Sequence, residues 1–496
     1  MAAAAKSMQS GPSAPEWRVT VPEGASVAVE PEACRAARAR AWLVSCVLEF
    51  RDRVLGFGRR VWRIGADDPR RAVHGLKVGL ALALVSVFYY TRPLYDGVGG
   101  AAMWAVLTVV VVFEYTVGGC VYKGFNRAFA TASAGVVALG VHWIASKSGD
   151  KFEPFIRSGS VFLLAAMATF SRFIPTVKAR FDYGVTIFIL TYSLVAVSGY
   201  RVGALLAMAQ QRVSTISIGV SICIAVCTLI CPVWAGQELH RATARNMEKL
   251  AGAVEACVED YFAAADASKQ PSSKAEGYKC VINSKASEDS QANLARWEPG
   301  HGGFAFRHPY AQYRNVGAAM RHCAYCVEAL SGCTRSAETQ AAPGRARRLL
   351  ADACTRVAAR CAGVLRAAST SVSEMATSRS LDLAVGEMNA AVQELQADLR
   401  ALPSKLLLAE ATAGSAERTE PLVGAAQLFT VTSLLIEVSA RIEGVVDAVD
   451  TLANLASFKS TGDENEKPVE SAAKAQPVIT NPVSEGNRTT KAIELA

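Results

Sequence analysis

The stretch GAAMWAVLTVVVVFEYTV occupies residues 100–117, and GGCVYKGFNR continues it to residue 127. Its first part is apolar over nearly the length of about 20 residues that a helix needs to cross a membrane. Comparable apolar runs lie on both sides, at 72–90, 128–145, 158–173, 184–199 and 213–234. We therefore predict an all-α membrane protein with six transmembrane helices, followed by a helical cytoplasmic domain.

Composition supports this division of the chain. Hydrophobic residues make up 51% of the 496 residues, but 19% are charged, which is too many for a protein that lies entirely in a membrane. We expect residues 1–71 to form a cytosolic arm, 72–235 the six-helix pore, 236–458 the helical cytoplasmic domain and 459–496 a disordered tail. Within the arm, 1–32 should be disordered.

The arm also contains a predicted amphipathic helix over 33–65. Its apolar residues near one side are Trp42, Leu43, Val47, Phe50 and Leu55, and arginines lie opposite. Such a helix is expected on the inner leaflet or on the protein.

Two features of the second half predict packed helices. From Leu381 the apolar residues alternate steps of four and three, at Val385, Met388, Val392, Leu395, Leu399 and Leu402, which favours core packing or helix pairing. The uncharged run 422–436 resembles a seventh span, but it continues into Glu437, Arg441 and Glu443 with the same period. We interpret it as a buried helix of the cytoplasmic domain.

Flanking charge predicts the orientation. Arginines crowd the approach to the first span, and Arg241 and Arg245 follow the sixth. Because Lys and Arg are retained on the cytosolic side during insertion, both termini should be cytosolic.

The sequence lacks the motifs that are typical of several classes of function. The chain contains no P-loop, dinucleotide glycine motif, HExxH or GxSxG, so we expect neither an enzyme nor a cofactor. Cys323 and Cys326 form a lone CxxC without a second pair at zinc spacing, which favours packing over a metal site. Nothing in the sequence resembles a nucleic-acid-binding motif.

Ionisable residues at membrane depth carry the functional hypothesis. Lys77 lies early in the first span, Glu114 deep in the second, and Arg127 and Arg212 at the starts of the third and sixth. Basic side chains that converge on an aqueous path select anions, although each could instead reach a headgroup near a helix end. Glu114 is expected to pair with a basic residue of a neighbouring helix.

Six stretches support a family resemblance. TVVVVFEYTVGGCVYKGFNR at 108–127 resembles the signature of the aluminium-activated malate transporter family of plants. The others are DDPRRAVHGLKVGLAL from Asp67, VKARFDYGVTIFILTYSLVAVSGYR from Val177, CPVWAGQELH from Cys231, NSKASEDSQANLARWEPGHG from Asn283 and YRNVGAAMRHCAYCVEALSGC from Tyr313.

The resemblance implies a homodimer of six-helix subunits in the lipid bilayer that conducts malate and other anions passively. It implies that Arg127 and Arg212 form a basic constriction, with Lys77 and Lys178 as further basic pore positions. We add Lys123 to these candidate anion-binding residues. Glu114 corresponds to a glutamate for gating or charge pairing. Trp297, Glu298 and Pro299 correspond to a WEP motif, whose role we take to be folding or gating of the cytoplasmic domain.

Departures from the family pattern leave alternatives open. The long N-terminal arm makes the vacuolar membrane an alternative to the plasma membrane. The loop 198–211 contains no acidic residue, so Asp96 is the main possible external cation contact and external aluminium should activate weakly at most. A coupled secondary exporter of organic acids and a membrane-anchored scaffold are the competing functions.

Overall fold

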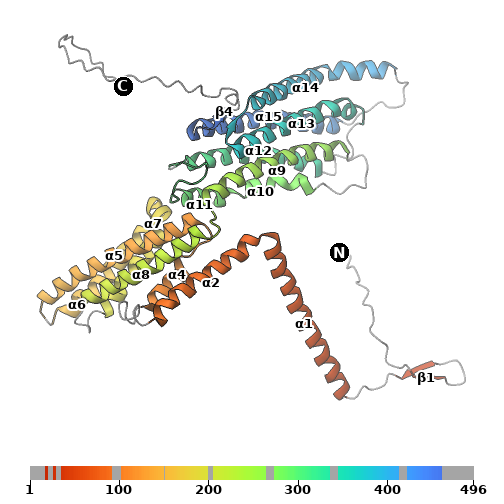
Figure 1. The fold of residues 1–496 in the computed structure, drawn as a ribbon. Helices are drawn as coiled ribbons and strands as arrows, with labels where there is room; N and C mark the ends of the chain where they lie inside the picture. The colour runs from red at the N-terminus through yellow and green to blue at the C-terminus, as the bar shows by residue number, and fades with distance from the viewer. Residues whose placement is uncertain are drawn as a thin grey trace, which may run out of the picture. The chain divides into compact units, whose positions relative to one another are not determined.

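The computed structural model describes residues 17–20, 26–29, 35–91, 102–149, 151–198, 205–263, 273–305, 307–335, 344–412 and 422–460 (Figure 1). They fall into two compact units, Met1–Val233 and Trp234–Ala496. Each unit is described by itself. Of the expected disordered tail 459–496, residues 461–496 lie outside the described residues, as do Asp96 and the loop 199–204. Its first two residues, Lys459 and Ser460, instead form a short strand.

The first unit is helical except near its start. There β1 (Trp17–Thr20) and β2 (Ser26–Val29) pair antiparallel, in a stretch where we had expected no structure. The helices are α1 (Arg35–Asp67), α2 (Pro69–Tyr90), α4 (Ala102–Val112), α5 (Val117–Lys147), α6 (Glu153–Ser171), α7 (Pro175–Ser198) and α8 (Leu205–Leu229).

Membrane-spanning capacity is clearest in the later helices of this unit. Within the described residues, four helices are long and apolar enough to cross a membrane, at 117–147, 153–171, 175–197 and 209–229. Large apolar side chains on α6, including Phe155, Phe162 and Phe170, are exposed, as a lipid-facing helix requires. The expected all-α membrane character is confirmed at this level.

Two predicted boundaries were wrong. The second apolar run does not continue as a helix to residue 117, because α4 ends at Val112 and residues 113–116 are not helical. The next helix begins eleven residues earlier than predicted, where the Thr116 hydroxyl accepts a hydrogen bond from the Gly119 amide and caps α5. Apolar content alone could not find this N-cap inside a continuous apolar run.

Glycines bring the helices of the first unit into close contact. α8 packs against α4 and α5, and α5 also packs against α7. A Cβ on Gly219 would lie 3.0 Å from the Ala105 carbonyl oxygen and 3.0 Å from Thr108 Cβ, and one on Gly124 would lie 2.8 Å from Val220 Cγ1. Small residues therefore set the α4–α8 and α5–α8 distances.

The second unit is a bundle of long helices around one core. Its main helices are α9 (Ala235–Ala263), α12 (Tyr310–Arg335), α13 (Gly344–Glu374), α14 (Arg379–Thr412) and α15 (Leu422–Ala456). Shorter elements are η2 (Ser273–Gly277), α10 (Tyr278–Ile282) and α11 (Lys285–Ala295), and β3 (Ala376–Thr377) pairs parallel with β4 (Lys459–Ser460). In the bundle, α9 packs against α12 and α13, α15 packs against α12 and α13, and α14 packs against α13 (Figure 1).

The predicted apolar stripe of this unit is confirmed. Leu381, Met388, Leu395 and Leu402 on α14 are buried in the common core. The ambiguous run at 422–436 belongs to α15, and Leu428, Val431 and Leu435 lie in the same core. Cys323 is also buried there and Cys326 packs against it, as predicted for structural cysteines.

Candidate anion pore

Arg127 lies inside a helix bundle rather than at a helix start. It lies inside α5, about 15 Å along the axis from Val117, and is only 3% exposed. Its Nε donates to the Thr108 hydroxyl of α4 at 3.1 Å, and that hydroxyl donates to the Trp104 carbonyl at 2.6 Å. The guanidinium is thus fixed against one turn of α4.

Arg212 reaches the same turn from another helix. It lies in the third turn of α8, not at its start as predicted, and its Cζ is 4.3 Å from the centre of the Trp104 ring. A guanidinium stacked on an indole gains a cation–π interaction but keeps its N–H groups available for an anion. Trp104 and Thr108 are one helical turn apart, so α4 brings the two arginines together.

Arg127 and Arg212 differ from those arginines of the unit that form ion pairs with carboxylates. Arg157 pairs with Glu153 at 2.6 Å, and Arg172 pairs with Asp182 at 2.7 Å. Within the described residues, no carboxylate pairs with Arg127 or Arg212. A desolvated cation without a counter-charge is costly, and a passing anion lowers that cost.

Glu114 lies at a helix end and not deep in a helix, so this expectation was wrong. It forms an ion pair with Lys123 of α5. Its neighbours contact the start of α2 and the segment that follows α8. The ring centres of Tyr115 and His74, near the start of α2, are 5.5 Å apart, and the Val117 amide donates to the Val233 carbonyl beyond α8. Glu114 therefore marks the end of the unit where α2 begins and α8 ends, and it does pair with a basic residue.

Lys77 is held at the same end. Its side chain is 3% exposed, and Nζ donates to the Cys231 carbonyl at 2.8 Å, just beyond the last turn of α8. A cation at a helix C-terminus is favourable for the helix dipole. Lys178, by contrast, is exposed in the first turn of α7. Lys123 also lies 5.7 Å from the centre of the Tyr183 ring.

The WEP motif builds a cap for α9 in the second unit. Glu298 is 7% exposed, and its Oε1 and Oε2 accept hydrogen bonds from the Ala235 and Gly236 amides at 2.6 and 3.0 Å. These amides open α9 and have no partner within the helix. A carboxylate there also interacts favourably with the helix dipole. Trp297 is half-buried and Pro299 is exposed.

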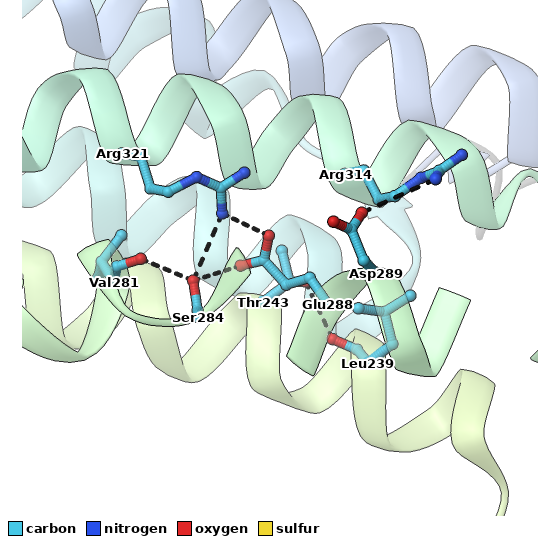
Figure 2. A network of polar contacts seen from close by, with 8 residues as sticks. All are labelled: Leu239, Thr243, Val281, Ser284, Glu288, Asp289, Arg314 and Arg321. Atoms are coloured by element: carbon cyan, nitrogen blue, oxygen red, sulfur yellow. Dashed lines mark hydrogen bonds and ion pairs between the residues drawn. The ribbon is translucent and has the colours of Figure 1, made fainter. Parts of the chain in front are cut away.

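A buried ion pair joins the two long motifs of the second unit (Figure 2). Glu288 of α11 pairs with Arg321 of α12 at 2.6 Å, and their side chains are 5% and 11% exposed. Ser284 donates to Glu288 at 2.6 Å, so the carboxylate has a second partner. Asp289 and Arg314 form a looser pair nearby at 3.7 Å. These contacts fix α11, and with it the WEP motif, against α12.

A chain of hydrogen bonds crosses the core beside this cap. The Tyr313 hydroxyl lies 2.9 Å from His240 Nδ1 and 3.1 Å from His308 Nε2, and His240 Nε2 lies 3.5 Å from the Ser373 carbonyl. A carbonyl only accepts, so His240 carries its proton on Nε2, Tyr313 donates to Nδ1, and His308 donates to Tyr313. Burial lowers the pKa of His308 to about 4 and also lowers the pKa of His240. Both rings are neutral at neutral pH.

Among the described residues, no three His, Cys, Asp or Glu side chains gather so that they could hold a metal ion.

Comparison with known proteins decides the family. The model of the family described as aluminium activated malate transporter matches residues 62–424. The chain belongs to the aluminium-activated malate transporter family. This is a family of transporters from plants and not of enzymes, as the sequence predicted.

Relatives match across both units. The chain is 48% identical to aluminum-activated malate transporter 10 of Arabidopsis thaliana, covering 91% of this chain and 97% of the relative. It is 42% identical to aluminum-activated malate transporter 2 of the same plant, covering 80% and 77%. It is 40% identical to aluminum-activated malate transporter 1 of Triticum aestivum, covering 83% and 88%.

Sequence reasoning about this malate transporter family member missed the neutral residues of the candidate pore. Trp104 and Thr108 lie in an apolar run, where a tryptophan and a threonine attract no attention. Their spacing of four places them on one helix face, but nothing in the sequence says that α5 and α8 send arginines to that face.

Proposed function

We propose that this protein is an anion channel that passes malate and other organic or inorganic anions passively. Arg127 and Arg212 form the basic constriction, and their meeting at one turn of α4 without a carboxylate is the observation that supports it. Such a pair lowers the barrier for anions and raises it for cations. The family name and the named relatives favour malate as a substrate.

The proposed arrangement has six spans, both termini in the cytosol, and two subunits in a plasma membrane, with the vacuolar membrane as the alternative. Under this topology the Lys123–Glu114 ion pair and Lys77 lie at the cytosolic end of the pore. We assign Lys77 and Lys178 to the approach to the constriction. The Lys123–Glu114 pair is the proposed gating element, because its separation would free a cation for the permeating anion.

A coupled exporter is the second candidate, because a broken apolar run is typical of coupled transporters. Residues 113–116 interrupt such a run here. The interruption lies beside the start of α2 and the end of α8, a helix-end position rather than the midplane that coupling sites occupy. We therefore favour the channel.

The test measures malate and chloride currents in Arg127→Ala and Arg212→Ala. At about 5 Å and an effective dielectric constant of about 20, one charge is worth about 3 kcal/mol to a monovalent anion and about twice that to a divalent one. We expect malate current to fall tenfold or more, and chloride current to fall less, at unchanged surface abundance.

The matched control is Lys147→Ala, which removes an exposed charge from the far end of the same helix, α5. It should leave the malate to chloride preference unchanged. An unaltered preference in both arginine variants would return these residues to the headgroup-contact alternative. In the same recordings, a reversal potential that follows the malate gradient alone supports a channel, and one that shifts with a proton gradient supports the exporter.

A further inference from the structure

Helix α1 presents a continuous apolar stripe that the first unit leaves exposed. The stripe repeats in steps of four and three, and its residues are each 50–70% exposed: Leu43, Val47, Phe50, Val54, Phe57, Val61 and Ile64. Trp42 and Trp62 are exposed near its two ends, at 65% and 80%. A stripe of this length is about 32 Å long and needs an apolar partner along all of it.

The charged residues of α1 indicate the sign of the charge that this partner needs. The helix contains eight arginines and three acidic residues. Arg51 and Arg53 form exposed pairs with Asp52 and Glu49. Within the described residues, Arg59, Arg60 and Arg63 pair with no carboxylate. Arg60 lies directly beside the stripe, so the partner is apolar along one line and negatively charged beside it.

A second copy of α1 fits this description poorly. In a paired coiled coil, the positions that flank an apolar stripe carry charges of opposite sign. Here Arg51, Arg53 and Arg60 flank the stripe on its two sides, and neither acidic residue in this stretch, Glu49 or Asp52, occupies a flanking position. Two such helices would place like charges together, whereas acidic lipid headgroups on both sides of the stripe satisfy them.

We propose that α1 lies in the headgroup region of the cytosolic leaflet, with its apolar stripe in the acyl boundary and its arginines on acidic lipid. Asp68, in extended conformation between α1 and α2, breaks the helix and caps α2, so α1 does not continue along the axis of α2. An amphipathic basic helix next to a first span is therefore free to turn into the membrane plane. The identity of the leaflet and the assignment of α2 as the first span rest on the proposed topology.

The test places photoreactive benzoylphenylalanine at Phe57, on the stripe, in the full-length protein. The matched control position is Ser45, on the opposite face of α1. The protein is reconstituted in nanodiscs of phosphatidylcholine alone or with about 30% phosphatidylserine, illuminated, and analysed by mass spectrometry. We expect lipid adducts from position 57 and not from 45, with a higher yield in the acidic discs.

Charge dependence is tested in the same discs with the triple variant Arg51→Gln, Arg53→Gln and Arg60→Gln, which neutralises the three arginines that flank the stripe. Each arginine near an acidic surface strengthens partitioning of the helix into the membrane about fivefold, so the triple variant should partition about a hundredfold less. The yield of lipid adducts from position 57 of this variant in acidic discs should therefore fall to the level in neutral discs. A cross-link from position 57 to a second chain, no adduct in either disc, or equal wild-type yields in both discs would overturn the proposal. Symmetric discs keep this result independent of topology and of conduction.

Discussion

Removal of the Glu298 carboxylate should destabilise the second unit measurably. The carboxylate makes two hydrogen bonds to opening amides of α9, at 2.6 and 3.0 Å, and is 7% exposed. Each charge-assisted bond is worth about 1.5–3 kcal/mol, but the two share one group and do not add fully. We expect Glu298→Ala to cost about 3 kcal/mol. Glu298→Gln keeps one acceptor oxygen and loses the charge, so it should cost about 1–2 kcal/mol.

The assay is thermal unfolding of the full-length protein in detergent, followed by tryptophan fluorescence. For a domain of this size, about 3 kcal/mol lowers Tm by about 9 °C. Trp234, stacked on His301 at 3.9 Å next to the cap, should change its emission in the same transition. The matched control is Glu394→Gln, whose exposed pair with Arg356 at 3.6 Å is worth less than about 1 kcal/mol.

If Glu298→Ala melts within about 1 °C of the wild type, the cap contributes nothing to stability and the folding role of the WEP motif is refuted. A lower Tm for Glu298→Ala than for Glu298→Gln, with Glu394→Gln unchanged, supports the cap. The capped end of α9 also lies close in sequence to the first unit, because α9 begins two residues after that unit ends at Val233.

Three further predictions concern single contacts. Arg321→Met leaves the Glu288 carboxylate buried without its cation, so it should cost about 3–5 kcal/mol, and Glu288→Gln in the same chain should recover part of it in chemical denaturation. The pKa of His308 is about 4 in the folded protein and 6.5 in the unfolded chain, so the unfolded chain binds the proton first as pH falls. The free energy of unfolding should therefore fall by up to about 3 kcal/mol between pH 6.5 and pH 4. His308→Gln should flatten this dependence of stability on pH. Micromolar external aluminium should raise malate current weakly at most, since a trivalent cation needs several carboxylates; a severalfold increase that disappears in Asp96→Asn would contradict this.

The local pattern of apolar and charged residues was enough to predict the membrane helices, one core-facing helix and two candidate pore residues. Apolar runs gave the membrane helices, and the apolar steps from Leu381 gave the core face of α14, because burial in lipid or in a helical core requires those periods in the chain itself. The basic residues at 127 and 212 stood out for the same reason, since a charge in an apolar run is expensive. The motif stretches also sufficed for the family.

Tertiary structure decided what those residues touch. The sequence placed Glu114 inside a helix, but α4 ends at Val112 and α5 begins only after the Thr116 cap. The pairing of Glu114 with Lys123 depends on how α5 starts. Arg127 and Arg212 are separated by eighty-four residues along the chain and meet only because Gly219 lets α8 approach the turn of α4 that carries Thr108. Contacts between distant segments depend on helix packing distances and rotations, which no local periodicity encodes.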